Sequence, residues 1–310
     1  MKTYQTGHIR NVVLLGSSKS GKTTLSEAMM FEGKVIDRRG TVEAKNTVSD
    51  NTEIEQINQR SIYATPLYTE FMDNKLNIID TPGADDFIGG VISAFKVCDS
   101  GIMLVNAQQG VEVGTELFGR YAEEHKKPLV VAINQLDADK ANWETTVDSL
   151  KQAFGSKIVL VQFPVATGAA FNSFVDVLKM KMYSFKDENG TREESDIPAD
   201  QMGQAEELQS ALMEMAAESD EALMEKYFEE GTLSHEDMIK GLNAGFLAGS
   251  IMPVFCLSAR KDIGVKRLME FVINVAPSPA GDSEMTKDGR SIPCDPDGPT
   301  AIFIYKNALE

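Results

Sequence analysis

Residues 12–24 read Val-Val-Leu-Leu-Gly-Ser-Ser-Lys-Ser-Gly-Lys-Thr-Thr, and this stretch decides the fold. Its apolar opening, Val12 to Leu15, predicts a buried strand that ends at Gly16, and helix-forming residues follow Thr23. A strand, a glycine-rich turn and a helix in this order form a loop whose backbone N–H groups, together with the helix N-terminus, can surround a phosphate. The sequence therefore predicts a phosphate-binding loop, and the alternative is an ordinary surface turn rich in glycine and serine.

Individual residues of this loop have separate expected roles. Lys22 would reach the β- and γ-phosphates of a nucleotide, Thr23 would place its hydroxyl on Mg²⁺, and Thr24 would reach the α-phosphate. The loop residues that we expect to contact the nucleotide are Gly16, Ser17, Ser18, Lys19, Ser20, Gly21, Lys22, Thr23 and Thr24.

Short apolar runs alternate with helical patterns along most of the chain. The runs predict strands over 62–71, 75–79, 100–105, 129–133, 158–165 and 251–257, and the helical patterns lie at 22–32, 84–97, 112–125, 141–154, 201–229, 234–248 and 264–275. Continuous apolar strands separated by helices are typical of a parallel sheet covered on both faces. We therefore expect an α/β fold with a doubly wound, mainly parallel sheet, and an irregular, functional or mobile segment over 33–60.

Further motifs follow other predicted strands. Asp80-Thr81-Pro82-Gly83 ends one strand; an aspartate there can hold Mg²⁺ through water, and the N–H of Gly83 can meet a γ-phosphate. Asn134-Gln135-Leu136-Asp137 ends another, at the sheet edge where such folds bind ligands, and Asp137 can accept from guanine N1–H and N2–H₂. Ser258-Ala259 follows a third strand and could approach guanine O6 through its backbone. In this order, the motifs indicate a site for GTP or GDP with Mg²⁺.

The composition is that of an ordinary globular protein with a strongly negative charge. Hydrophobic residues make up 42% of the 310 residues, and the formal net charge is −17. This charge argues against electrostatic wrapping of nucleic acid by this chain alone. No apolar stretch approaches membrane-spanning length, the N-terminus has no signal-peptide pattern, and the three cysteines lack metal spacing. We therefore expect a cytoplasmic protein that is monomeric and has no membrane partner.

Several other stretches match one known family. They are Arg10-Asn11-Val12, Leu76 to Gly83, Asp220 to Tyr227, Pro253 to Cys256, Ser258-Ala259, Pro277-Ser278-Pro279 and Asp295 to Pro299. With these stretches, nearly the whole chain resembles the N-terminal GTP-binding region of translation elongation factor G and of the related tetracycline-resistance ribosomal protection proteins. That family carries an inserted subdomain in the gap that here separates Asp137 from Ser258, and this insert selects the family over other GTPases.

The resemblance implies a domain organisation and a function. The GTP-binding domain of the P-loop NTPase class would occupy 1–157 and 251–279, with an inserted α+β subdomain at 158–250. Residues 280–310 would be a linker and the first strand, 301–305, of a truncated β-barrel domain. The expected function is that of an elongation factor G-like translation factor that binds Mg²⁺–GTP and acts on the ribosome through rRNA and ribosomal proteins.

Two departures from the family motifs lie in the expected nucleotide site. The family's Asp-Thr-Pro-Gly-His carries a histidine that positions the attacking water, and Ala84 stands in its place. Alanine can neither hydrogen-bond a water nor stabilise charge, so we expect slow or absent GTP hydrolysis and no catalytic residue at this position. The family's Asn-Lys-x-Asp is Asn134-Gln135-x-Asp137 here, and Gln135 would line the base and ribose less well than lysine. We therefore expect guanine selectivity with weaker affinity.

At two further positions the family pattern leaves alternatives open. In the family's Arg-Gly-Ile-Thr switch, an ungapped alignment from Asp80 places Ser61 on the threonine, whereas aligning Arg60 with the family arginine places Tyr63 there. Ser61 is the better candidate because its hydroxyl can ligate Mg²⁺. Lys19 replaces a family aspartate that helps to hold a monovalent cation, and its ammonium would either take the place of that cation or point into water.

Whether the protein is an enzyme therefore stays open at the level of sequence. One alternative is an active translational GTPase, or a ribosomal protection protein, that uses another catalytic group. The other is a P-loop ATPase or kinase without a role in translation. Asp137 argues against an adenine nucleotide, because adenine lacks the two donors that the carboxylate would accept.

Overall fold

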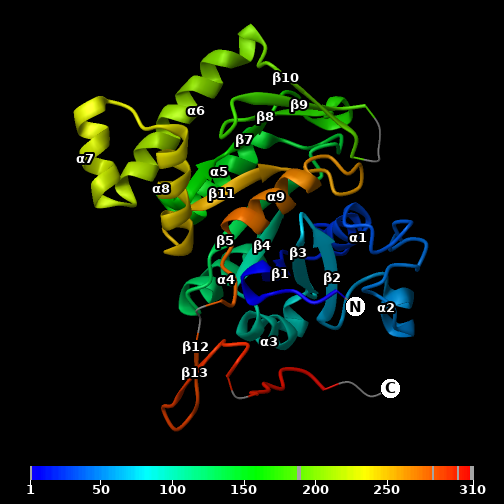
Figure 1. Ribbon diagram of the computed structural model, residues 1–310. Coiled ribbons are helices and arrows are strands. Elements are labelled where there is room, and N and C mark those ends of the chain that lie inside the picture. Colours follow the sequence, from blue (N-terminus) through cyan, green and yellow to red (C-terminus); the bar gives the residue numbers. More distant parts are fainter. Residues whose placement is uncertain (1, 187–189, 281–282, 299, 308–310) are drawn as a thin grey trace.

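A seven-stranded sheet forms the centre of the computed structural model, which describes residues 2–186, 190–280, 283–298 and 300–307 (Figure 1). The strand order is β2-β3-β1-β4-β5-β11-β6, and all neighbouring pairs are parallel except β2 with β3. The strands are β1 (Ile9–Leu15), β2 (Thr65–Phe71), β3 (Asn74–Asp80), β4 (Ser100–Asn106), β5 (Leu129–Asn134), β6 (Ile158–Leu160) and β11 (Met252–Cys256). The predicted α/β fold with a mainly parallel central sheet is confirmed.

Helices connect and cover these strands. They are α1 (Lys22–Glu32), α3 (Ile88–Val97), α4 (Val113–Glu124), α5 (Trp143–Phe154) and α9 (Val265–Val275), with the 3₁₀ turns η1 (Thr6–His8), η2 (Asp85–Phe87) and η3 (Gly155–Lys157). α1 packs against α9, and Phe95 of α3 stacks on His125 at the end of α4 with ring centroids 6.0 Å apart. The central strands β4 and β5 are buried along their whole length. This burial explains why their sequences are continuously apolar rather than alternating.

The segment between α1 and β2 is more regular than its sequence indicates. It contains α2 (Glu53–Asn58), which begins with a capping box formed by Thr52 and Glu55. Glu27 of α1 is buried, and its carboxylate accepts the N–H groups of Gly40 at 2.7 Å and Val48 at 2.6 Å. A buried carboxylate needs such donors, so Glu27 fixes the path of this segment beside the phosphate-binding loop. With 6 residues, α2 is too short to show a helical period in the sequence.

The segment between β6 and β11, which we call the inserted part, lies at one end of the molecule (Figure 1). Its four-stranded antiparallel sheet has the order β10-β9-β8-β7, formed by β7 (Gln162–Pro164), β8 (Ser173–Asp176), β9 (Lys181–Phe185) and β10 (Arg192–Ser195). The turn η4 (Gly168–Ala170) precedes β8, and the helices α6 (Ala199–Glu218), α7 (Glu221–Glu230) and α8 (His235–Leu247) follow β10. None of the helices in the described ranges has the length and apolarity needed to cross a membrane.

Two predicted elements are divided in this part of the chain. The strand expected over 158–165 is two strands, β6 in the central sheet and β7 in the second sheet, with buried Val161 between them. The residues before and after Val161 are largely buried, so the sequence is apolar throughout and does not indicate where one strand ends and the next begins. The helix expected over 201–229 is also two helices, because Asp220 caps α7 by accepting the N–H groups of Ala222 and Leu223.

The segment after α9 differs most from the sequence-based expectation. The predicted linker contains a two-stranded hairpin, β12 (Ser283–Met285) with β13 (Ser291–Pro293). The strand predicted over 301–305 is not formed within the described residues 300–307, where no ladder partner is present and a strand requires one. Lys306 instead donates from Nζ to the carbonyl oxygen of Ala64 at 2.6 Å. Pro299, which ends the stretch resembling the start of a second domain, lies outside the described residues.

Candidate nucleotide-binding site

The phosphate-binding loop joins β1 to α1 at the carboxyl edge of the central sheet. Lys22 is buried, and its Nζ donates to the carbonyl oxygens of Gly16 at 2.7 Å and Ser17 at 3.1 Å. Burial lowers the pKa of Lys22 to about 8, and nearby carboxylates, chiefly Asp80, oppose this shift. A phosphate would act in the same direction as these carboxylates, because negative charge stabilises the ammonium. The loop therefore holds its cation where an anionic ligand compensates for the burial.

Two glycines are required by the conformation of this loop. Gly16 has a φ of 140° and Gly21 a φ of 97°, both in the region that favours glycine. A Cβ on Gly21 would lie 2.3 Å from Asn134 Nδ2, and a Cβ on Gly16 would lie 2.5 Å from a backbone carbonyl oxygen of β4. A Cβ on Gly83 would come within 2.5 Å of Lys22 Nζ. The strand end that carries Gly83 thus lies directly against the lysine, as expected for two groups that share a phosphate.

Two hydroxyl groups donate to the carboxylate of Asp80, and a third lies beside one of them. Thr23 Oγ1 donates to Asp80 Oδ2 at 2.8 Å, and Ser49 Oγ donates to the same oxygen at 2.6 Å. Ser61 Oγ lies 3.2 Å from Thr23 Oγ1. The structure therefore brings together Thr23, Ser61 and Asp80, the residues expected to hold Mg²⁺. Tyr63, the alternative to Ser61 in the switch, is 48% exposed.

The buried carboxylates of this cluster fit a divalent cation. Asp80 Oδ1 and Asp50 Oδ1 are buried and have no hydrogen-bond partner among the described residues. Burial raises the pKa of Asp80, against the hydrogen bonds from Ser49 and Thr23, and burial raises the pKa of Asp50 to about 6. Both shifts mean that the carboxylate charge is incompletely compensated, and a hard cation with oxygen ligands would compensate for it. The hydroxyl and carboxylate oxygens present therefore match the ligand preferences of Mg²⁺.

Asn134 and Gln135 connect three strand ends. Asn134 Nδ2 donates to the carbonyl oxygen of Ser20 at 2.8 Å, and Asn134 Oδ1 accepts the N–H of Ala259 at 3.0 Å. Gln135 Nε2 donates to the carbonyl oxygen of Lys19 at 2.8 Å. The loops after β1, β5 and β11 are therefore tied together at one edge of the sheet. Ligands bind at this carboxyl edge in open parallel sheets.

The other predicted nucleotide contacts have different surroundings. Asp137 and Thr24 are partly buried, whereas Ser18 and Lys19 are exposed. Exposure of Lys19 agrees with the alternative in which its ammonium points into water. Ser258 is fully buried, and its Oγ accepts a backbone N–H three residues further along the chain at 3.2 Å. The hydroxyl of Ser258 thus stabilises the turn, and the backbone of the following residue is what reaches the site.

Three residues of the site were not predicted from the sequence. Ser49 and Asp50 lie in the segment before α2, beside Asp80 and Ser61. Asn106 ends β4, and its Nδ2 donates to Gln135 Oε1 at 3.2 Å. A signal was available for Asn106, because it is a polar residue at the carboxyl end of a buried strand, as Asn134 is. The sequence indicates Ser49 and Asp50 more weakly, because they are only adjacent polar residues in an irregular segment that follows the first helix.

Ala84 lies between Gly83 and η2 (Asp85–Phe87). Its methyl group supplies neither a hydrogen-bond donor nor an acceptor. The three histidines of the chain lie before β1 (His8), after α4 (His125) and at the start of α8 (His235). None of these positions follows a strand of the central sheet at its carboxyl edge. The structure therefore brings no histidine to the position that Ala84 occupies.

Comparisons with known proteins identify relatives of this chain. The family model described as the elongation factor Tu GTP binding domain matches residues 7–278. Among solved structures, the crystal structure of ttk003000868 from Thermus thermophilus is similar, with a TM-score of 0.83 and 29% sequence identity. The similarity covers 88% of this chain and 41% of that chain, so this chain spans about two fifths of the length of that relative.

Proposed function

Because the chain belongs to the family of elongation factor Tu-type GTP-binding domains, we propose that it is the GTP-binding region of an elongation factor G-like translation factor. As a GTPase domain of the translation-factor family, it has guanine nucleotide as its ligand. In the proposed function, the GTP-bound factor acts on the ribosome during elongation, while hydrolysis is slow or absent. Ribosome engagement would then follow nucleotide binding, and release would not be timed by hydrolysis.

The inserted part supports the elongation factor G-like assignment. A four-stranded sheet and the helices α6, α7 and α8 lie between β6 and β11, in the gap that separates Asp137 from Ser258. Translation-factor GTPases share the phosphate-binding loop, so the loop does not distinguish between them. An insert at this position, with both sheet and helices, is the feature that favours the elongation factor G-like branch.

The residues of the site have the following proposed roles. Lys22 and the N–H of Gly83 contact the terminal phosphates, and Asp137 accepts hydrogen bonds from the guanine base. Thr23, Ser61 and Asp80 would hold Mg²⁺, which neutralises negative charge on phosphate oxygens when it is bound. Asn134 holds the loops after β1, β5 and β11 in register, so that the base and phosphate contacts face one nucleotide.

Ala84 is the single observation that carries the proposal of slow hydrolysis. A general base or a water-positioning group contributes about 10²–10⁴-fold to a reaction rate. The side chain of Ala84 has no atom that could orient or deprotonate a water. Nucleotide binding does not depend on this residue, because the contacts of Lys22, Thr23 and Asp137 are elsewhere. Binding is therefore retained in the proposal while turnover is reduced.

Ribosome-stimulated GTP turnover of the full-length protein tests this proposal. We expect turnover far below that of an ordinary elongation factor, together with measurable GTP binding in a fluorescence titration. Ala84→His should raise the single-turnover rate by about 10–100-fold, because it supplies the missing group. Ala84→Leu is the matched control, since it adds a side chain without a hydrogen-bonding atom and should leave the rate unchanged. Turnover of the unmodified protein equal to that of an ordinary elongation factor would contradict the proposal.

An active GTPase is the second candidate, and the position of Asp85 favours it. A Cβ on Gly114 of α4 would lie 3.1 Å from Ser17 Oγ and 3.8 Å from Asp85 Oδ1. The Asp85 carboxylate and Ser17 of the phosphate-binding loop therefore both lie beside Gly114, and the carboxylate could accept a proton from a water. In this case Asp85→Asn would lower turnover about 100-fold without changing GTP affinity. If turnover is slow and Asp85→Asn has no effect on it, this second candidate is ruled out.

A further inference from the structure

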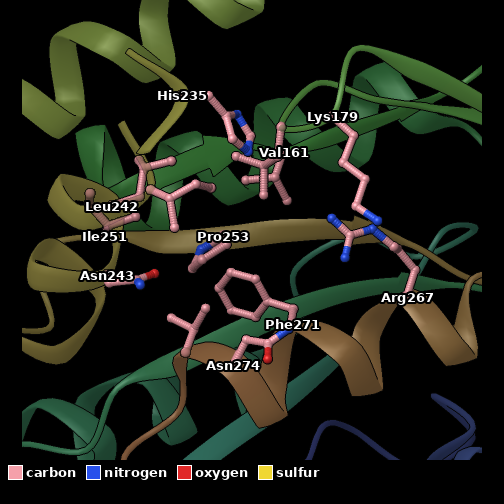
Figure 2. Close-up of a pocket in the computed structure, with 13 residues that line it drawn as sticks. Val161, Lys179, His235, Leu242, Asn243, Ile251, Pro253, Arg267, Phe271 and Asn274 are labelled. Carbon is pink, nitrogen blue, oxygen red and sulfur yellow. The ribbon is translucent and has the colours of Figure 1, made fainter. Parts of the chain in front are cut away.

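A cavity of about 180 Å³ lies between the inserted part and the GTP-binding part of the chain (Figure 2). Lys179, between β8 and β9, and Leu242 of α8 line it from the inserted part. Pro253 near the amino end of β11 and Phe271 of α9 line it from the GTP-binding part. Because the nucleotide site lies at the carboxyl end of β11, this cavity is separate from it.

One end of the cavity is cationic and the remainder is mainly apolar. Lys179 and Arg267 supply the charged end, while Leu242, Pro253 and Phe271 supply apolar surface (Figure 2). Burial raises the pKa of the nearby Glu270. Arg192, Arg267 and Lys179 outweigh this effect and together hold the pKa of Glu270 below its usual value. Lys179 and Arg267 both line this end of the cavity.

Arg267 is a buried and oriented donor. Its side chain is 9% exposed, Nε donates to Asp176 Oδ2 at 2.6 Å, and Nη1 donates to Glu270 Oε2 at 3.1 Å. Within the described part of the chain these bonds use Nε and Nη1, so the N–H groups of Nη2 remain for a ligand. Two carboxylates fix the plane of the guanidinium, and a donor that is fixed before binding loses little entropy when it binds.

One of the cations at this end of the cavity has no carboxylate partner among the described residues. Asp176 and Glu270 are paired with Arg267, and Glu270 also accepts from Arg192 at 2.7 Å. Lys179 has no ion pair with any described residue, and it lies 6.0 Å from the ring of a neighbouring tyrosine. Of the two cations that line the cavity, Arg267 has carboxylate partners and Lys179 has none among the described residues. A ligand with a negative charge would give Lys179 an ionic partner.

We propose that this cavity binds a compact amphipathic carboxylate, an aromatic or branched aliphatic acid of about ten non-hydrogen atoms. An apolar cavity of about 150 Å³ is sufficient to bind benzene, so a cavity of about 180 Å³ can hold a six-membered ring with one further group. The carboxylate lies between Lys179 and Arg267, where it accepts charge-assisted hydrogen bonds. The hydrocarbon body packs on Leu242, Pro253 and Phe271. This site goes beyond the proposed function and does not depend on it.

The test is a titration of the whole chain with benzoate, followed by NMR chemical shifts. We expect saturable binding with a Kd on the order of 1 mM, as suits so small a ligand. The shifted amide signals should come from Lys179, Leu242 and Phe271. Benzyl alcohol has the same ring without the charge and should bind at least tenfold more weakly. Equal binding of the alcohol, or shifts confined to other parts of the chain, would overturn the proposal.

Two variants and one control complete this test. Lys179→Met removes the unpaired cation at an exposed position and should weaken benzoate binding about tenfold. Lys186→Met is the matched control, since Lys186 is an exposed lysine paired with Glu193 and does not line the cavity. Asn274→Trp, also at an exposed position, should fill the cavity and abolish binding. Unchanged benzoate affinity in Lys179→Met contradicts the proposal even if the tryptophan variant fails to fold.

Discussion

Two regions of the candidate nucleotide site differ in the polar groups that they offer: the phosphate side, formed by the phosphate-binding loop, and the hydrolytic side, at Ala84. On the phosphate side, Gly16, Gly21, Lys22 and Thr23 are all present, and buried hydrogen bonds hold them in place. On the hydrolytic side, Ala84 carries no polar atom. The residues proposed to hold the nucleotide are therefore different from the residue on which the proposal of slow hydrolysis rests.

Removing the lysine of the phosphate side should have the largest effect. We expect Lys22→Met to weaken GTP and GDP binding at least about 100-fold, because charge-assisted hydrogen bonds to the phosphates are lost. The fold should survive, since the substitution removes a buried charge and keeps a similar volume. Fluorescence titration with a labelled guanine nucleotide measures the change, and Lys96→Met at an exposed position of α3 serves as the control. Retained affinity in Lys22→Met would show that the loop does not bind phosphate.

A change on the base side should be smaller and specific to the base. Asp137→Asn is expected to weaken GTP binding about 30-fold, because an amide cannot accept both guanine donors. ATP affinity should not change, and XTP should gain affinity because xanthine presents a carbonyl where guanine presents an amine. Competition titrations with the three nucleotides measure this outcome. Asp139→Asn, at an exposed residue two positions along the chain, is the control, and an equal effect of both variants would exclude a specific role for Asp137.

A test of the switch distinguishes Ser61 from Tyr63. Ser61 Oγ lies 3.2 Å from Thr23 Oγ1, so Ser61→Ala should remove a Mg²⁺ ligand and raise the Mg²⁺ concentration needed for GTP binding about fivefold. Tyr63→Phe removes the hydroxyl of the alternative residue and should change nothing. The measurement is a Mg²⁺ titration at fixed GTP concentration. The reverse pattern, with an effect from Tyr63→Phe alone, would assign the switch position to Tyr63.

The smallest expected effect on nucleotide affinity comes from Asp262, a residue that concerns stability rather than binding. Asp262 is buried, and Arg39 Nη1 lies 3.9 Å from its Oδ2. Burial and the neighbouring Glu32 carboxylate raise the pKa of Asp262 from 3.8 to about 8, against the opposing effect of Arg39 and Lys266. The folded protein therefore keeps a proton that the unfolded chain releases above about pH 4, so stability from this group is full below pH 4 and is lost as pH rises to about 8.

Asp262→Asn removes that pH dependence. We expect the variant to be more stable than the unmodified protein by about 1–3 kcal/mol at pH 8.5, and the difference to shrink toward pH 4. Urea unfolding at several pH values measures it. Nucleotide affinity should change less than threefold, which would separate residues that support the fold from those of the site. A stability difference that does not vary with pH would contradict the assigned pKa.

The fold was predictable where local sequence and long-range packing agree. The strand–turn–helix at residues 12–24 and the buried strands β4 and β5 were predicted because their apolar pattern follows directly from burial on both faces. The break at Val161 was not predicted, because the apolar run continues through it although its two halves join different sheets. The helix α2 was missed because its stability comes from capping and from the buried carboxylate of Glu27 rather than from a hydrophobic period.

The candidate site shows the same division. The sequence by itself determined the residue types at the strand ends, including Lys22, Asp80 and Ala84, since motif and spacing depend on neighbours along the chain. Only the tertiary structure decided that Ser49 and Asp50 lie at the carboxylate of Asp80, and that α8 and α9 enclose a cavity with a buried arginine. The physical reason is that such contacts join segments far apart in sequence. Their distances depend on how whole elements pack, which no local pattern specifies.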